Sequence, residues 1–286
     1  MKENRELEKQ QAVLVELLEE FDRVCKKHGI PYMVFCGTAL GAFRHKGIIP
    51  WDDDLDVTML RDDYERFLKL APADLNEKYY LQAEGSEHWT MNFSKLRKNN
   101  TTYLEKYHPK DKNTHEGIYI DIFPCDNASD KKWLRKIQFY ASRVAVAKAL
   151  WERGYETDSI PKKIFMRFCR CLPRKPFLNL SILRKEPNSQ YVQTFLACTS
   201  RYKKGIYKRE WLTESMEMDF ENRKVPVSAH YDELLTTMYG DYMKLPDEKD
   251  RKIKEHAVLI DTERNYTEYE HYRDGMKFEV HTRNIH

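Results

Sequence analysis

A short acidic segment that runs directly into an apolar one is the feature that most limits how this chain can fold. Residues 52–56 read Asp-Asp-Asp-Leu-Asp, and apolar residues dominate from there to Leu60. This run predicts a buried strand over Leu55–Leu60. Side chains two apart on a strand face the same way, so we expect Asp54 and Asp56 to share one face. Like charges held this close are costly unless a cation lies among them.

A solvated loop and a calcium-binding loop are two alternatives to a cation site in this segment. An acidic run is usually a solvated loop, but the apolar residues that follow at once argue against that. A calcium-binding EF-hand loop fits poorly, because it needs Gly at its sixth position and Glu at its twelfth. Counted from Asp52, those positions hold Val57 and Asp63.

A glycine and a hydroxyl residue open the helix that precedes the acidic run. Residues 32–36 predict a short buried strand, and Gly37-Thr38 then begins a helix to about Arg44. Glycine permits close approach of a ligand, and the free N–H groups of a helix N-terminus attract phosphate. An ordinary turn is the alternative interpretation of a Gly-Thr pair.

A third carboxylate lies in the apolar segment Gly117–Phe123. Asp121 has apolar neighbours on both sides within this predicted strand. A lone buried carboxylate is expensive unless it is paired or binds a metal. The alternative is a capping or hydrogen-bonding role at the strand end before Pro124.

The order of predicted elements indicates an α+β fold with an added helical region. Helices are predicted over 3–28 and 62–70, the second with Asp62 as its N-cap, and further strands over 79–82 and 91–96. Residues 129 to about 200 have helical patterns, and residues 206–250 have mixed helix and strand patterns. No helix or strand is predicted for the tail from about residue 260. We therefore predict a catalytic core over 1–128, a helical region over 129–205 and a mixed region over 206–286 that completes the site.

Composition excludes several classes of protein. Lys and Arg number 49 against 46 Asp and Glu, a net charge of +3, which argues against a dedicated nucleic-acid binder. No apolar run is long enough for a transmembrane helix, and the charged N-terminus is unlike a signal peptide. The six cysteines form no C-x-x-C pair. They predict buried free thiols and a reducing, cytoplasmic location.

These elements together resemble the nucleotidyltransferase superfamily, and within it the LicD family of phosphocholine transferases, which is related to fukutin-type proteins. The resemblance covers roughly residues 10–256. It is carried by 37–57, by Lys95-Leu96-Arg97, by 117–124 and by Tyr239-Gly240-Asp241-Tyr242-Met243-Lys244-Leu245-Pro246. Thr38 stands where the superfamily has Ser, and the hydroxyl is kept. The resemblance implies a nucleotidyltransferase-like mixed sheet flanked by helices.

The same resemblance implies a reaction and a set of site residues. Such enzymes transfer phosphocholine from CDP-choline, or a similar phospho-alcohol from a CDP-linked donor, to a hydroxyl of a cell-surface glycan such as lipopolysaccharide or teichoic acid, and release CMP. Mg²⁺ or Mn²⁺ is expected at Asp54, Asp56 and Asp121, and Asp121 is a candidate base. The residues expected at the donor phosphates are Gly37, Thr38, Arg44, His45, Lys95 and Arg97.

A choline head group would need aromatic side chains around its quaternary ammonium. The candidates are Trp51, Trp89, Tyr107 and Tyr119, each with burial in the core as the alternative.

Residues 160–185 carry eight Lys or Arg and no acidic residue. Ile164, Phe165, Phe168 and Leu172 share one predicted helical face in this segment. Such a helix suits contact with an anionic inner membrane face, where lipid-linked acceptors are found; a core helix with a basic outer face is the alternative.

The sequence is also compatible with three further functions. They are a nucleotidyl or polyol-phosphate transferase of the same fold, an inactive binding protein and a lipid-surface adaptor.

Overall fold

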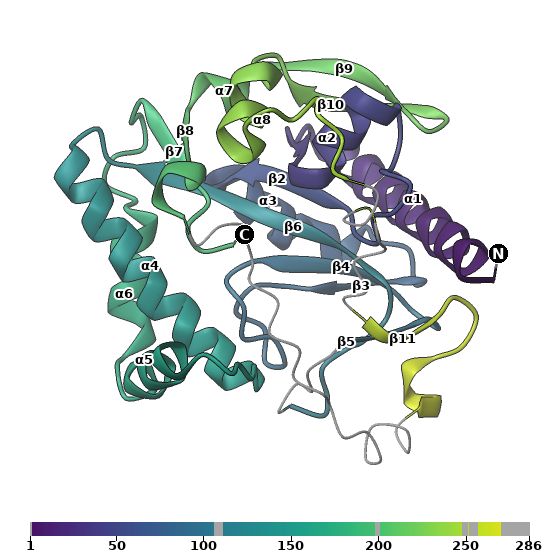
Figure 1. Cartoon of the computed structure of the whole chain (residues 1–286), viewed down its shortest axis with the longest axis horizontal. Coiled ribbons are helices and arrows are strands. Elements are labelled where there is room, and N and C mark those ends of the chain that lie inside the picture. The colour runs from purple at the N-terminus through teal and green to yellow at the C-terminus, as the bar shows by residue number, and fades with distance from the viewer. Residues whose placement is uncertain (1, 106–110, 198–200, 248–250, 252–256, 270–286) are drawn as a thin grey trace.

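The computed structural model describes residues 2–105, 111–197, 201–247, 251 and 257–269. The first half of the chain alternates helices with strands, as Figure 1 shows. Its elements are α1 (Lys2–His28), β1 (Met33–Val34), α2 (Cys36–His45), β2 (Asp56–Leu60), α3 (Arg61–Leu70), β3 (Tyr79–Gln82), β4 (Ser94–Lys98), β5 (Thr102–Glu105) and β6 (Tyr119–Ala128).

The second half of the chain adds helices and shorter strands. These are α4 (Lys132–Arg153), α5 (Ile160–Arg170), α6 (Arg174–Ile182), β7 (Tyr191–Gln193), β8 (Ile206–Lys208), α7 (Glu210–Thr213), β9 (Ser215–Phe220), β10 (Arg223–Ser228), α8 (Tyr231–Tyr239) and β11 (Ala257–Asp261). The predicted helical segment 160–185 forms two helices, because it is interrupted at Pro173 as expected from the sequence.

The main sheet has the strand order β1-β2-β6-β4-β3, and β7 and β8 extend it from the far end of β6. β2 runs parallel to β6, whereas β4 runs antiparallel to it. This mixed sheet confirms the predicted α+β, nucleotidyltransferase-like fold. β9 and β10 form a separate hairpin, and β11 pairs with β5, which gives the unassigned tail a place as far as Tyr269.

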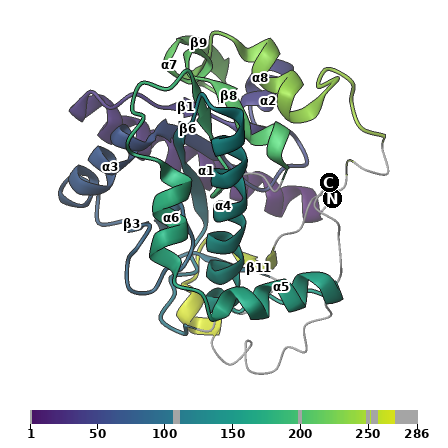
Figure 2. The same cartoon turned by 90° about the vertical axis from the view of Figure 1, so that its left-hand side faces the viewer.

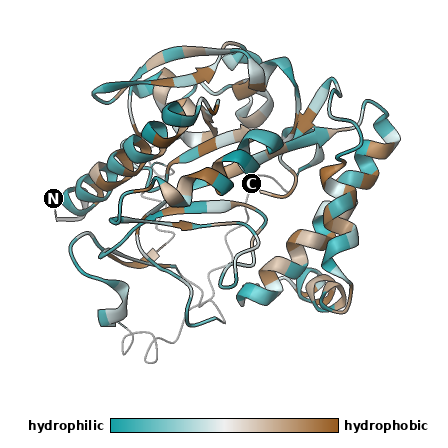
Figure 3. Ribbon diagram, turned by 180° about the vertical axis from the view of Figure 1, so that it is seen from behind, coloured by the Kyte–Doolittle hydropathy of each residue, from teal (hydrophilic) through white to brown (hydrophobic). Residues whose placement is uncertain are grey.

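One face of the sheet is covered by α1 and α3. Hydrophobic residues recur along α1 in Figure 3, and Leu14, Leu17 and Phe21 are fully buried in the main core. This is the spacing that predicted the helix, since residues three and four apart share a face. The opposite face of the sheet is apolar around Phe123, where β8 and α8 pack, and polar at the start of β2.

Two local predictions were wrong. α3 begins at Arg61 after Leu60, so Asp62 lies in the first turn instead of capping it, where its charge still favours the helix dipole. Cys171 is exposed at the end of α5, because the chain turns outward there. Cys25, Cys125 and Cys169 are buried free thiols as predicted, and Cys36 is half-buried. Cys198 lies outside the described residues.

The helical region packs beside the end of β6. Figure 2 shows α4 and α6 side by side, with α5 lying across the lower end of α4. Along the described chain, no helix is both long and apolar enough to cross a membrane.

A buried ion pair fastens α3 to β6. Arg61 Nε donates to Asp126 Oδ1 at 2.6 Å, and both side chains are buried. We expect Asp126→Ala to lower the free energy of unfolding by about 3 kcal/mol, because it leaves a buried guanidinium short of a partner. Urea denaturation measures this. Glu65→Ala, which breaks an exposed pair with Arg184, is the control and should cost about 0.5 kcal/mol or less. Equal losses in the two variants would contradict the structural role of the buried pair.

Candidate active site

Strand register places two carboxylates and a lysine in one row across the sheet. Asp56 of β2 is opposite Asp121 of β6, and Asp121 is opposite Lys95 of β4. Residues opposite one another in a sheet point to the same face, so the three side chains are neighbours. Lys95 Nζ lies 3.2 Å from Asp121 Oδ1. The predicted meeting of Asp56 and Asp121 is therefore a consequence of parallel pairing between β2 and β6.

The charged form of Asp56 is disfavoured at its position in the fold. Burial raises its pKa well above the ordinary value, and the negative charges of Asp54, Asp121 and Asp52 add to the shift. Burial also raises the pKa of Asp121, although the adjacent Lys95 opposes that rise. The charged forms of both carboxylates are thus disfavoured unless positive charge is supplied.

The acidic loop before β2 is held by α1. Gln10 Nε2 donates to the carbonyl of Asp53 at 2.7 Å, and Gln11 Nε2 donates to that of Asp52 at 2.9 Å. One carboxylate oxygen from each of Asp52, Asp53 and Asp54 lies within 4.8 Å of the other two. The sequence analysis did not single out Asp52. It also placed Asp54 on the strand, whereas β2 begins only at Asp56, so Asp54 approaches from the loop.

The helix start at Gly37-Thr38 contacts this loop directly. A Cβ on Gly37 would come within 2.7 Å of Asp52 Oδ2, so glycine is needed for the carboxylate to approach α2. Thr38 Oγ1 accepts a hydrogen bond from the Asp56 amide at 2.8 Å and fixes the start of β2. The hydroxyl is thus placed at the site, with a backbone partner of its own.

The two predicted cations of β4 are buried and have partners. Lys95 lies between Asp121 and Glu105, 3.5 Å from Glu105 Oε1, and burial lowers its pKa to about 8 despite those two carboxylates. Arg97 donates to the Gln82 side chain and to the Gly117 carbonyl at 2.7 and 2.6 Å. Arg97 therefore supports the sheet behind the site, and its donor-phosphate role stays a prediction. Lys95 contacts the site itself.

Glu105 joins this row to the helical region. Burial alone would raise its pKa, but Arg153, Lys95 and Arg97 together hold the pKa far below its usual range. Arg153, the last residue of α4, donates to Glu105 Oε2 at 2.6 Å. The end of α4 is thus linked to Asp121 through three ion pairs: Arg153 with Glu105, Glu105 with Lys95, and Lys95 with Asp121.

Two of the four aromatic candidates for a choline cage do not fit, and a third lies outside the described residues. Trp89 is buried, and the guanidinium of Arg153 stands 4.6 Å from its ring centre. Lys95 Nζ lies 3.1 Å from the ring centre of Tyr119. A quaternary ammonium would compete with these resident cations, so neither ring is available to it. Tyr107 lies outside the described residues.

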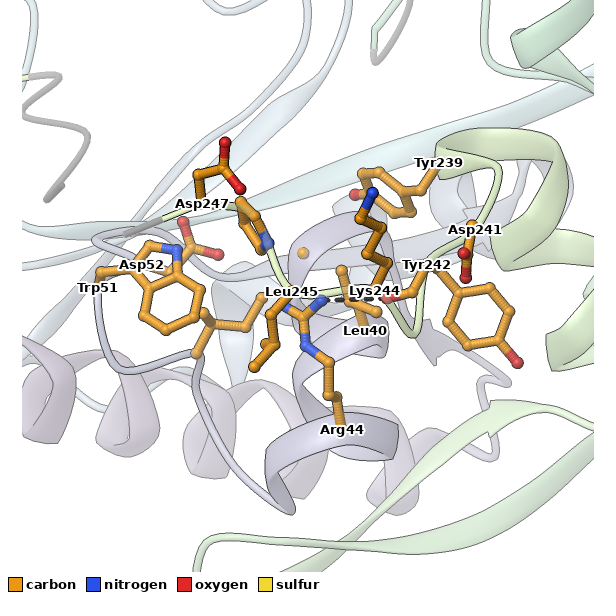
Figure 4. Close-up of a pocket in the computed structure, with 13 residues that line it drawn as sticks. Leu40, Arg44, Trp51, Asp52, Tyr239, Asp241, Tyr242, Lys244, Leu245 and Asp247 are labelled. Carbon is orange, nitrogen blue, oxygen red and sulfur yellow. Dashed lines mark hydrogen bonds between the residues drawn. The ribbon is translucent and has the colours of Figure 1, made fainter. Parts of the chain in front are cut away.

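The fourth candidate, Trp51, lines a pocket of about 530 Å³ beside the acidic loop. The guanidinium of Arg251 stands 5.8 Å from its ring centre, farther than the cations nearest to Trp89 and Tyr119. Figure 4 shows this pocket, whose walls come from α2, the acidic loop and the segment after α8. The lining residues are Gly37, Leu40, Arg44, Ile49, Trp51, Asp52, Tyr239, Asp241, Tyr242, Lys244, Leu245, Pro246 and Asp247. Two segments nearly 200 residues apart in sequence therefore meet at one cavity.

The predicted cations of α2 differ in their suitability. Arg44 lines the pocket, and its Nη1 donates to the Tyr242 carbonyl at 3.0 Å. His45 lies against Trp51, and burial together with the charge of Arg44 lowers its pKa. His45 is therefore neutral at neutral pH and a weaker phosphate ligand than predicted. Lys244, which was quoted only as part of the family segment, adds a cation to the pocket wall.

Tyr239 is a site residue that the sequence analysis did not assign. The residue is 44% exposed overall, but desolvation around its hydroxyl raises its pKa above the usual value, and the negative charges of Asp56 and Asp52 add to the rise. In Figure 4 its hydroxyl points into the pocket. Only its position within the family-like segment 239–246 hinted at this.

The residues present fit a divalent cation. The Asp52–Asp54 loop supplies oxygens within 4.8 Å of one another, and Asp56 and Asp121 have raised pKa values that a cation would lower again. Carboxylate oxygens are the ligands preferred by Mg²⁺ and Mn²⁺.

A mixed sheet with carboxylates on neighbouring strands, a helix N-terminus beside them and a pocket with cationic walls defines the nucleotidyltransferase-fold class. The chain belongs to the LicD family within that class. The family model "LicD/FKTN/FKRP, nucleotidyltransferase domain" matches residues 29–149. The lipopolysaccharide cholinephosphotransferase LicD of Haemophilus influenzae is 31% identical over 256 residues, which cover 86% of this chain and 94% of that protein.

Shorter matches occur with uncharacterised proteins of two Rickettsia species. The R. typhi protein is 39% identical over 72 residues, 25% of this chain and 23% of that protein. The R. prowazekii protein is 39% identical over 59 residues, 21% of this chain and 22% of that protein. The family assignment confirms the resemblance drawn from the sequence.

Replacing Asp56 by Asn should separate catalysis from stability. We expect Asp56→Asn to lose turnover, because a predicted metal ligand is removed. Its melting temperature without metal should rise at neutral pH. The raised pKa of Asp56 means that its charged form destabilises the fold above the ordinary carboxyl pKa. The gain should vanish at acidic pH, where Asp56 is protonated in both states.

Asp62→Asn is the control for that experiment, since Asp62 is exposed in the first turn of α3. It should keep both turnover and melting temperature nearly unchanged. Near-wild-type activity in Asp56→Asn would reject a role for this carboxylate.

Proposed function

We propose that this protein transfers phosphocholine from CDP-choline to a hydroxyl of a cell-surface glycan and releases CMP. The observation that carries the proposal is the row of Asp56 and Asp121 beside a pocket with cationic and aromatic walls. The similarity to a lipopolysaccharide cholinephosphotransferase over 86% of the chain supports the same reaction. By this proposal the acceptor is lipopolysaccharide or a comparable glycan.

The chemistry exchanges a phosphoanhydride bond of the donor for a phosphoester bond to the acceptor. The acceptor hydroxyl oxygen forms a bond to the phosphorus that carries choline, and the bond between that phosphorus and the bridging oxygen of the diphosphate breaks. CMP leaves with the bridging oxygen, and the hydroxyl proton passes to a base. Asp121 is our candidate for that base, and Lys95 at 3.2 Å stabilises the carboxylate form that accepts a proton.

The remaining negative charge in the reaction lies on the diphosphate. The N-terminus of α2 at Gly37 and the side chains of Arg44 and Lys244 face the same cavity, so they are suited to bind phosphate oxygens there. A Mg²⁺ or Mn²⁺ ion held by Asp54, Asp56 and Asp121, with Asp52 beside them, would neutralise the charge that develops on the phosphates.

We assign the choline group to the aromatic part of the pocket. Trp51 and Tyr239 present ring surfaces there, and Asp241 and Asp247 also line the pocket. A quaternary ammonium is attracted both to aromatic faces and to nearby carboxylates. This combination favours choline over an uncharged polyol as the transferred alcohol.

The proposal also includes a lipid-linked acceptor and a peripheral membrane contact through residues 160–185. This segment is connected to the site, because Arg153 at the end of α4 pairs with Glu105.

Direct assay of the products distinguishes the proposed reaction from its relatives. The protein is incubated with Mg²⁺, a lipopolysaccharide acceptor and one donor at a time: CDP-choline, a CDP-linked polyol or CTP. Release of CMP and incorporation of choline only from CDP-choline are expected. Pyrophosphate release from CTP would instead establish nucleotidyl transfer, and absence of any release would support the inactive binding protein.

Replacing the candidate base tests its role. We expect Asp121→Asn to lower turnover by about 100-fold or more, the size expected for loss of a general base. Binding of CDP-choline, measured by calorimetry, should fall less than turnover. Wild-type rates in this variant would leave Asp121 with a structural role.

Replacing Trp51 tests the head-group assignment. A cation–π contact contributes on the order of 1 kcal/mol, so Trp51→Ala should raise KM for CDP-choline by about fivefold. KM for a CDP-linked polyol should change less, and Trp51→Phe, which keeps a ring, is the matched control. Equal increases for both donors would show that Trp51 contacts the part that the donors share.

A further inference from the structure

Helix α5 exposes hydrophobic side chains to solvent. Ile160, Ile164 and Phe168 follow one another at intervals of four residues and are 69%, 64% and 64% exposed. Residues four apart lie on one face of a helix, so these side chains form a continuous stripe, and Phe165 is exposed beside it.

The opposite side of α5 makes the contacts that hold the helix in the fold. Met166 and Cys169 are buried against Ala147 of α4, and the half-buried Lys162 donates to the Tyr155 hydroxyl at 3.0 Å. The helix therefore has a separate packing side, and the apolar side predicted from the sequence is not the one that packs inward. The core-helix alternative is wrong for Ile164, Phe165 and Phe168.

A second exposed stripe lies on the helix that supports α5. Trp133, Ile137 and Tyr140 are exposed at helical spacing along the first half of α4. The same helical face continues to Val144 and Trp151, which pack against the α5 cluster. The two stripes thus lie on one side of the helical region, and Figure 2 shows the two helices together. We call their seven residues the α4–α5 apolar face: Trp133, Ile137, Tyr140, Ile160, Ile164, Phe165 and Phe168.

Positive charge accompanies the α4–α5 apolar face. Lys163, Arg167 and Arg170 are exposed on α5, and no acidic residue occurs in 160–185. Lys132 and Lys136 are exposed next to the stripe on α4. Soluble surfaces of this extent normally mix both signs of charge, whereas an amphipathic helix with cations flanking an apolar stripe is typical of binding at an anionic bilayer.

We propose that the α4–α5 apolar face docks on an anionic lipid bilayer. The aromatic and aliphatic side chains would enter the boundary between head groups and acyl chains, while Lys163, Arg167 and Arg170 face anionic head groups. Charge complementarity favours the bilayer over a protein partner, because Lys163, Arg167 and Arg170 flank the apolar stripe from Ile164 to Phe168.

The α4–α5 apolar face is structurally connected to the candidate active site. α4 ends at Arg153, whose ion pair with Glu105 leads through Lys95 to Asp121. This step rests on the proposed function. Docking would hold the site next to the bilayer surface, where acceptors carried on lipid are concentrated.

Vesicle binding tests the surface without any catalytic readout. The full chain is sedimented with vesicles of equal parts phosphatidylglycerol and phosphatidylcholine, and with vesicles of phosphatidylcholine alone. We expect binding to the first, weakened by salt, and little binding to the second. Absence of binding to the anionic vesicles at low salt overturns the proposal.

Paired variants separate the two contributions. Each cation near an anionic surface contributes about 1 kcal/mol, so Lys163→Glu with Arg167→Glu should weaken binding by about 25-fold or more. Ile164→Ser with Phe168→Ser should weaken it by about tenfold, since apolar contact area is lost. All four side chains are exposed, so the fold should survive, and circular dichroism checks it.

Control variants carry matched changes elsewhere on the surface. Lys69→Glu with Lys208→Glu alters net charge equally, and Met216→Ser with Val258→Ser removes exposed apolar groups from β9 and β11. These should bind vesicles as the wild type does. An equal loss in the controls, or undiminished binding in both α5 variants, overturns the proposal. CMP release with a delipidated, soluble acceptor should be unchanged in the α5 variants, so a failure of the transferase proposal is seen separately.

Discussion

The electrostatic free-energy cost of placing Asp56 and Asp121 side by side is the constraint on which the polar contacts around the site depend. Parallel pairing of β2 with β6 brings the two carboxylates together on one sheet face, and burial raises the pKa of each. Such an arrangement persists only where the rest of the fold over-determines it and where positive charge is close. Lys95 provides one such charge from the next strand, and a divalent cation is the other that we propose.

Parts of the chain far from the site hold this arrangement in place. Gln10 and Gln11 of α1 bind carbonyls of the acidic loop, and Thr38 of α2 binds the amide of Asp56. Glu105 balances the charge of Lys95 from the opposite side, and Arg153 in turn pairs with Glu105. The apolar core under the sheet supplies the stability, and these polar contacts set the position of the carboxylates.

The helical region has two relations to the catalytic core. It is tied to the site by the ion pair of Arg153, yet α5 turns hydrophobic side chains to solvent. In a chain whose α1 and α3 bury most of their apolar residues, an exposed stripe on α5 is better explained by an external surface than by imperfect packing. By these proposals, catalysis and docking on a membrane use adjacent but distinct parts of one chain.

The sequence by itself determined the α+β class and the helices and strands of the first half of the chain apart from β5, whereas the meeting of Asp56 with Asp121 was implied only by the family resemblance. Periodicity and local motifs encode these helices and strands, because they depend on residues that are close along the chain. It also suggested the amphipathic segment 160–185, but periodicity cannot tell which side of such a helix faces the core.

Only the tertiary structure decided the features that join distant segments. The pocket between α2 and residues 239–247, the placement of Tyr239 and Lys244 in it, and the support of the acidic loop by Gln10 depend on contacts that no local pattern records. The same holds for Trp89 and Tyr119, aromatic candidates whose rings are occupied by cations from other strands and helices. Burial and neighbouring charge act through space, so which carboxylate is strained, which ring is free and which helix face is exposed follow from the packing of the whole chain.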